Sequence, residues 1–184
     1  HLERIGGNLV LLQNESLTQL EGLSSLATID GSVFIDGNAS LETLQPLHSL
    51  SEIGHNLIVD GNRRLTSLAG FESITTIRGS MIIANNNALE ALEGVENLTE
   101  IADDLLISGN PELLTLSSLT NLTAVRGKLW ISSNEKLRAL NGLHRMTTVG
   151  SDIGIVDNAA LENLEGFPAF AALPGELRLT GNSS

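Results

Sequence analysis

The sequence lacks cysteine and tyrosine altogether, and it has only four Pro, four Phe and one Trp among 184 residues. The absence of cysteine excludes a disulfide framework, a thiol nucleophile and any zinc or iron–sulfur site with Cys ligands. Aromatic residues make up 3 % and apolar residues 41 % of the chain, so the core has to be built from Leu, Ile, Val and Ala. No apolar run approaches the roughly 20 residues of a transmembrane helix, so no membrane span is predicted.

Basic residues are scarce as well. Ten Lys and Arg stand against 22 Asp and Glu, which gives a formal net charge of −12, and the largest basic cluster is the pair Arg63-Arg64. Nucleic acids and anionic membranes are bound through clusters of Lys and Arg. We therefore expect no nucleic-acid partner.

A 24-residue unit repeats along the whole chain without insertion or deletion. It begins at Ile5, which we number position 1, and it reads approximately I-x-G-x-L-x-I-x-x-N-x-x-L-x-x-L-x-G-L-x-x-L-T-x. Seven full units and a final half unit leave no room for a linker or a second domain, so residues 1–184 are predicted to form one repeat domain. The partial repeat at the ends favours a segment of a longer protein. Since a unit this short cannot bury its own apolar face, neighbouring units must stack into a solenoid.

Each unit combines two apolar rhythms. Residues alternate with period two at positions 5 and 7, as in Leu9 and Leu11, which predicts a short strand with one buried face. Leucines then follow every third residue, which favours tight turns or 3₁₀-like pieces over an α-helix. The sequence therefore predicts an all-β, parallel β-solenoid of about seven to eight rungs, spanning roughly 34 Å at 4.8 Å per rung.

Position 10 of the unit is asparagine in every rung. A buried Asn offers two donors and an acceptor, so a stack in register can satisfy turn backbones along the solenoid axis. Glycine precedes four of these residues and marks a sharp corner. We predict a structural Asn column of Asn14, Asn38, Asn62, Asn86, Asn110, Asn134, Asn158 and Asn182.

The segment LTSLAGFESITTIRGSMIIANNNALEALEGV, residues 65–95, resembles the receptor L-domain family. This is a leucine-rich-repeat-like, right-handed β-helix found in the ligand-binding lobes of insulin- and EGF-receptor-type ectodomains and in fungal and bacterial surface proteins. The nearer likeness is to the regular, Cys-free arrays of microbial or protist surface proteins. The resemblance implies a right-handed solenoid, an open sheet on which ligands dock, and an extracellular or cell-surface location.

Position 6 of the unit faces away from the core and yet is apolar in six successive rungs. Such a row on an outer face is typical of an interface, and large aromatic residues are enriched at interfaces. The alternative is β-propensity, or cover by another segment, because central strand positions favour branched and aromatic residues even when half exposed. We predict that a ligand or partner binds to Val10, Phe34, Ile58, Ile82, Leu106 and Trp130.

The sequence predicts no catalytic centre, metal site or cofactor. His48 and His144 share a column but stand four rungs apart, roughly 19 Å, which is too far to hold one metal ion. No Ser, His and Asp constellation falls on adjacent rungs of one face. The Asp-Gly-Asn corners at Asp36 and Asp60 lack the alternating acidic ligands of a calcium loop.

Five Asn-x-Ser/Thr sequons occur, of which three belong to the Asn column. Only Asn97 and Asn121, in outward loop columns, are possible glycosylation sites, provided that the chain enters a secretory pathway.

These observations favour a non-enzymatic recognition or adhesion module, extracellular or at the cell surface, that binds a protein or glycan ligand on its open sheet face. The alternative is a structural subunit that self-associates into a filament or surface layer. A polysaccharide-acting β-helix enzyme would need clustered acidic residues in a groove, and the sequence offers none.

Overall fold

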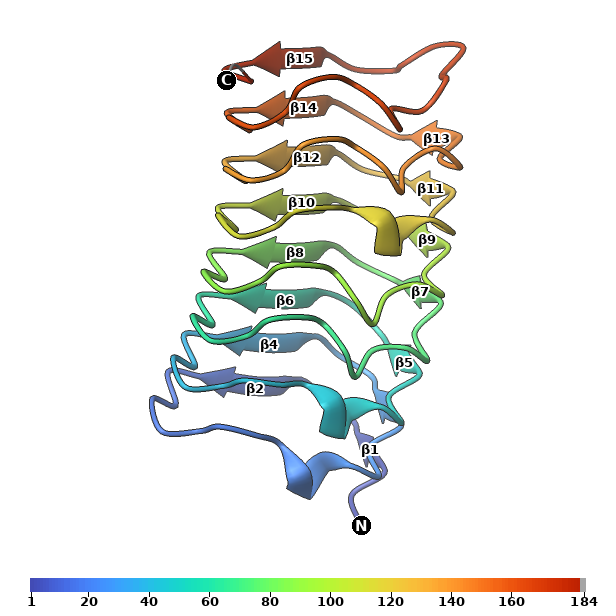
Figure 1. The fold of residues 1–184 in the computed structure, drawn as a ribbon. Helices are drawn as coiled ribbons and strands as arrows, with labels where there is room; N and C mark the ends of the chain where they lie inside the picture. The colour runs from blue at the N-terminus through green and yellow to red at the C-terminus, as the bar shows by residue number, and fades with distance from the viewer. Residues whose placement is uncertain (183–184) are drawn as a thin grey trace.

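The protein is described by a computed structural model over residues 1–182. Within these residues the chain winds into an all-β solenoid of about seven turns with a 24-residue repeat and almost no helix (Figure 1). The fold class predicted from the repeat is confirmed, and its parallel strands stack in register from one end to the other.

The longer strands form one parallel sheet of eight strands, called sheet B here. Each strand covers positions 5–8 of its unit and pairs with residues 24 positions away, as Leu105 does with Leu129. The strands of sheet B are β2 (Leu9–Leu12), β4 (Val33–Asp36), β6 (Leu57–Asp60), β8 (Met81–Ala84), β10 (Leu105–Ser108), β12 (Leu129–Ser132), β14 (Ile153–Val156) and β15 (Leu177–Thr180).

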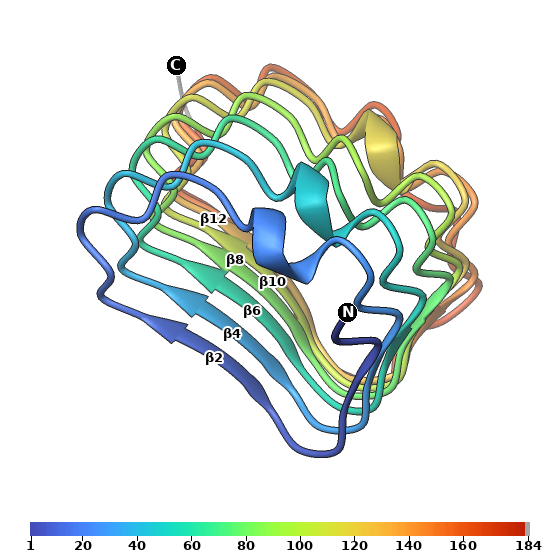
Figure 2. The same cartoon turned by 90° about the horizontal axis from the view of Figure 1, so that it is seen from below.

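Two-residue strands form a second parallel sheet of seven strands, called sheet A, just before sheet B in each turn. Viewed along the axis, the long strands line one side of the solenoid, and turns close the opposite side (Figure 2). The strands of sheet A are β1 (Arg4–Ile5), β3 (Thr28–Ile29), β5 (Glu52–Ile53), β7 (Thr76–Ile77), β9 (Glu100–Ile101), β11 (Ala124–Val125) and β13 (Thr148–Val149).

Three short 3₁₀ helices occur on the turn side: η1 (Glu21–Leu23), η2 (Gln45–Leu47) and η3 (Ser117–Leu119). In four other rungs position 18 is a glycine with positive φ: Gly70 at 125°, Gly94 at 109°, Gly142 at 114° and Gly166 at 86°. A Cβ on Gly70 would collide with the Leu44 carbonyl of the preceding rung, so this glycine allows the rungs to approach. Around position 18 the chain therefore turns in one of two ways, through a short 3₁₀ helix or through a glycine with positive φ.

The core is a continuous aliphatic stack. Positions 1, 5 and 7 of the sheets and the turn leucines are fully buried in the middle rungs, for example Ile101, Leu105 and Ile107 at 0 % exposure. Phe71 is the one aromatic residue among these fully buried side chains of the described chain. Identical slots recur at each rung, so branched aliphatic residues fill them without voids.

The Asn residues at position 10 form a hydrogen-bonded ladder at the corner after sheet B. The backbone N–H of each donates to the Oδ1 of the Asn one rung further on, over 2.9–3.2 Å from Asn14 to Asn182. Each Nδ2 from Asn38 onward donates to the position-7 carbonyl of the preceding rung. The six residues from Asn38 to Asn158 are 0 % exposed, so this ladder satisfies buried backbone at every corner.

No helix in the described part of the chain is long and apolar enough to cross a bilayer.

Candidate functional site

The outer face of sheet B carries the apolar row predicted at position 6. Strand pairing sets its members side by side, with Val10 opposite Phe34 and Leu106 opposite Trp130. Along each strand they alternate with core residues, so their side chains point away from the solenoid interior. Figure 2 shows no described segment crossing this side of the sheet.

Neighbouring rungs cover part of each side chain in the row. Val10, on the edge strand, is 50 % exposed, and the residues from Phe34 to Trp130 are half-buried. The row therefore forms an apolar strip across six strands, in which each side chain is only partly exposed. It ends at β14, where position 6 is Gly154, and β15 places Arg178 there.

Trp130 lies face-down over Gly154. A Cβ on Gly154 would collide with three carbons of the indole six-membered ring, Cδ2, Cε3 and Cζ3, which are nearly equidistant from it. An approach to the ring edge would leave one of the three far more distant, so the glycine faces the flat of the ring. The indole thus covers the gap in the apolar row and turns its other face outward.

A second ladder runs beside the row, at position 4. The side-chain oxygen of one rung accepts a hydrogen bond from the position-4 backbone N–H of the next rung, as Asn8 does from Ser32 at 2.8 Å and Asn56 from Ser80 at 2.9 Å. Serines continue it in the intervening rungs, where Ser32 Oγ accepts from the Asn56 N–H at 3.1 Å. Apart from the buried Ser32, the residues of this ladder are exposed or half-buried, and the residue type changes from rung to rung.

Glycines at position 3 make room for the position-4 side chains. In every second rung the Asn or Asp Oδ1 of the preceding rung occupies the place of a Cβ; the glycines are Gly31, Gly79, Gly127 and Gly175. Gly7, at the same position in the first rung, has nothing within 4 Å. The outer face of sheet B therefore has a 48-residue superperiod, two rungs long.

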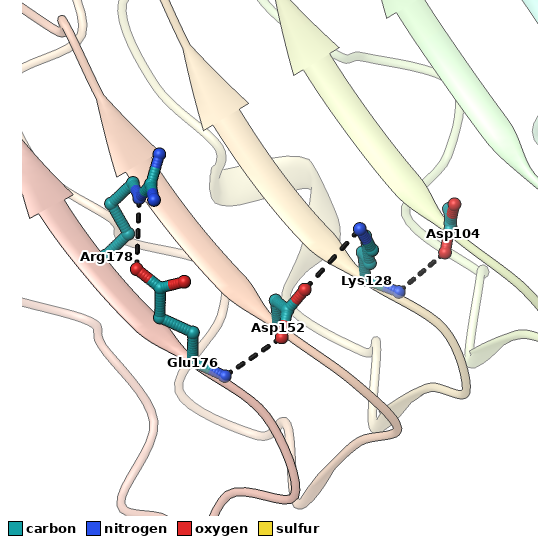
Figure 3. Close-up of polar contacts among 5 residues, drawn as sticks. All are labelled: Asp104, Lys128, Asp152, Glu176 and Arg178. Atoms are coloured by element: carbon teal, nitrogen blue, oxygen red, sulfur yellow. Dashed lines mark hydrogen bonds and ion pairs between the residues drawn. The ribbon is translucent and has the colours of Figure 1, made fainter.

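The last four rungs of the position-4 ladder are charged, whereas the first four are neutral. Asp104 Oδ1 accepts from the Lys128 N–H at 2.7 Å, and the Lys128 Nζ lies 3.4 Å from Asp152 Oδ2 (Figure 3). Asp152 Oδ1 accepts from the Glu176 N–H at 2.9 Å, and Glu176 pairs with Arg178 at 3.1 Å. The Glu176 N–H, and then the Lys128 ammonium, lower the pKa of Asp152 below its ordinary value.

The two candidate glycosylation sites lie on another side of the solenoid. Their side chains bridge rungs, since Asn97 Nδ2 donates to the Glu72 carbonyl and Asn121 Nδ2 donates to the Glu96 carbonyl, each at 2.8 Å. Asn121 also accepts from Arg145 at 3.0 Å, and it is less exposed than Asn97. A glycan at either residue stays a prediction.

Among residues 1–182, no group of three or more His, Asp or Glu side chains is placed to hold a metal ion. His48 Nδ1 lies 3.1 Å from the backbone oxygen of Gln45, within its own turn.

Residues 53–141 match the family model described as Receptor L domain. The match covers slightly less than half of the chain, and this central segment is similar to receptor L domains. The solenoid is consistent with the L-domain fold, and the family is one of non-catalytic, receptor-type ligand-binding domains that are typically extracellular. Comparison with curated proteins gave no match, and comparison with solved structures gave none either. The likeness to microbial or protist surface proteins stays a prediction.

Three features of the outer face of sheet B were missed by sequence reasoning: the position-4 ladder, its two-rung period and the stacking of Trp130 on Gly154. A signal for the period was present, because Asn8, Asn56, Asp104 and Asp152 are spaced by 48 residues and each precedes a rung with glycine at position 3. The stacking had no local signal, because the two residues lie 24 positions apart.

Proposed function

We propose that this chain is a recognition or adhesion module at the cell surface or outside the cell, and that it binds a protein ligand with the outer face of sheet B. The supporting observation is the strip of apolar side chains from Val10 to Leu106, aligned across five strands and left uncovered by the described chain. In the middle of the sheet the outward positions that flank the strip can be polar, as Asn56 and Asp60 are on either side of Ile58.

The family supports a protein ligand, since receptor L domains are ligand-binding modules. The chemistry of the strip supports it too: apolar side chains at the centre, with hydrogen-bonding groups along position 4 and, in β4, β6 and β10, at position 8, resemble the core and rim of a protein interface. A cell-surface location rests on the family alone.

Peptides selected from a phage-displayed random library on the wild-type chain test the proposal. We expect selected peptides to lose at least tenfold in affinity for Leu106→Glu, because a carboxylate at the strip cannot be desolvated against an apolar partner. The matched control is Leu114→Glu: Leu114 is 48 % exposed and lies outside both sheets, so this variant should bind as the wild type does.

Equal binding to both variants would overturn the proposal. Concentration-dependent oligomers in light scattering, dissolved by Leu106→Glu, would instead assign the strip to self-association into a filament or surface layer. Unfolding curves of both variants show whether each remains folded.

A further inference from the structure

We infer that the indole of Trp130 is a stacking platform for one sugar ring of a neutral glycan, with Lys128, Asp152 and Arg178 supplying hydrogen bonds to its hydroxyl groups. The inference rests on the proposed function, because it needs the same face of sheet B to be a binding surface, and it names a ligand class for the C-terminal part of that face.

The first observation is the orientation of the ring. Gly154 supports one face of the indole, and the covering leaves Trp130 half-buried with the opposite face toward solvent. The C–H groups on one side of a pyranose ring carry partial positive charge, and they are attracted to the negative face of an aromatic ring. An indole that stood on edge could not offer this surface.

The second observation is the set of polar groups around the platform. Lys128 and Asp152 lie at position 4, in the same rung as the indole and in the next, and Arg178 follows Gly154 at position 6. The side chains of Lys128 and Arg178 are 50 % and 51 % exposed. Lys128 Nζ pairs with one carboxylate oxygen and has three N–H donors, and Arg178 pairs through Nε alone, so both retain donors for a ligand. Both oxygens of Asp152 already take part in a contact, but each carboxylate oxygen can accept more than one hydrogen bond, so the site offers remaining donors on the cations and acceptors on Asp152 to hydroxyl groups, which both donate and accept.

The third observation is the balance of charge. Asp104, Lys128, Asp152, Glu176 and Arg178 together carry a formal charge of −1, with the signs interspersed along the sheet (Figure 3). A phosphate or sulfate would meet three carboxylates, and an ammonium ligand would meet two cations. A neutral polyol gains hydrogen bonds from both signs without either repulsion.

Trp130 also reports on its own site, because it is the one tryptophan of a chain without tyrosine. The test is a fluorescence titration of the wild-type chain with four linear oligosaccharides: cellotetraose, chitotetraose, mannotetraose and laminaritetraose. We expect at least one to change the Trp130 emission saturably, with a Kd of about 1 mM, as for a small and exposed site. No response from any of the four at about 10 mM would overturn the inference.

N-acetylphenylalanine amide is titrated alongside. A response to this compound and to none of the sugars would also overturn the inference, since the platform would then bind aromatic side chains. Calorimetry extends the test to Trp130→Leu, which keeps an apolar cover over Gly154 but has no flat face. We expect Trp130→Leu to weaken sugar binding about tenfold or more, and Trp130→Phe to weaken it less.

Two further variants separate this inference from the proposed function. Asp152→Asn should change the order of preference among the four sugars, whereas Ile58→Glu, on the aliphatic strip, should leave sugar binding as in the wild type. Sugar binding that survives Trp130→Leu overturns the platform. If the wild-type chain bound no peptide at the strip but still bound a sugar at Trp130, the proposed function alone would be overturned.

Discussion

Two ladders hold the rungs of this solenoid together, and they use the same bond in opposite directions. In the buried ladder an Asn oxygen accepts from the rung before it, as Asn110 does from Asn86. In the exposed ladder an oxygen accepts from the rung after it, as Asn56 does from Ser80. The buried ladder is Asn in every rung, whereas the acceptors of the exposed ladder are Asn, Ser and Asp, and Lys128 at the same position has no side-chain oxygen to accept the bond.

Burial accounts for the difference. A buried corner has to satisfy a backbone N–H, a carbonyl and the side chain itself without water, and only the amide of Asn offers the acceptor and both donors in that space. On the outer face water supplies whatever the side chain does not. Hydrogen bonding therefore does not restrict the residue type on the outer face, and the side chains there can be selected for ligand binding instead.

The largest effect is expected from Asn110→Ala. The substitution removes the acceptor of the buried Asn86 N–H and the side-chain donor to the Ile83 carbonyl, and it should lower the free energy of unfolding by about 3 kcal/mol. Chemical denaturation monitored by circular dichroism measures it. Asn110→Ser should cost nearly as much, and a loss under about 1 kcal/mol for both would contradict the assigned role of the ladder.

Gly79→Ala should have the next largest effect. Its Cβ would displace the Asn56 Oδ1 and would lie 2.9 Å from the His55 carbonyl carbon, so we expect a loss of about 1–2 kcal/mol in the unfolding free energy. Gly7→Ala is the control at the same repeat position, since its Cβ would meet nothing within 4 Å. Equal stability of the two variants would show that the exposed ladder does not restrict position 3.

Asn56→Ala should lower the free energy of unfolding by about 1 kcal/mol or less. The Ser80 N–H that loses its acceptor is half-buried and within reach of water. Asn56→Ser should be close to neutral, since Ser32 and Ser80 already accept this bond in neighbouring rungs. The same denaturation series measures both variants. If Asn56→Ala proved as costly as Asn110→Ala, the comparison between the ladders would fail.

The smallest effect concerns pH. The pKa of Asp152 is lower in the folded chain than in the unfolded one, so its contribution to stability is complete above the unfolded value of about 3.9. That contribution disappears as the pH falls through the lower folded value. Thermal unfolding of the wild type against Asp152→Asn should therefore converge in strongly acidic solution, and a constant difference between the two at every pH would refute the pairing.

The repeat made most of the fold predictable. The position of Asn110 is Asn in every rung, and the position of Leu105 is always Leu, Val, Ile or Met. A column of constant chemistry indicates the same environment in each rung. The apolar row was visible for the same reason, since Ile58 and Ile82 share a position that ought to be polar. The exposed ladder was not visible, because water tolerates several residue types there. The stacking of Trp130 depends on the rotamer of one side chain and on Gly154 in the neighbouring rung, which no local pattern encodes.

Methyl NMR tests the central claim, that the outer face of sheet B is the binding surface, most directly. Ile82 and Ile83 are neighbours in β8, with Ile82 on the outer face and Ile83 fully buried in the core. When a peptide selected on the wild type is added, the δ1 methyl signals of Ile58 and Ile82 should shift and those of Ile83 and Ile107 should stay nearly constant. Shifts confined to methyl groups outside sheet B, such as those of Leu114, would contradict the account.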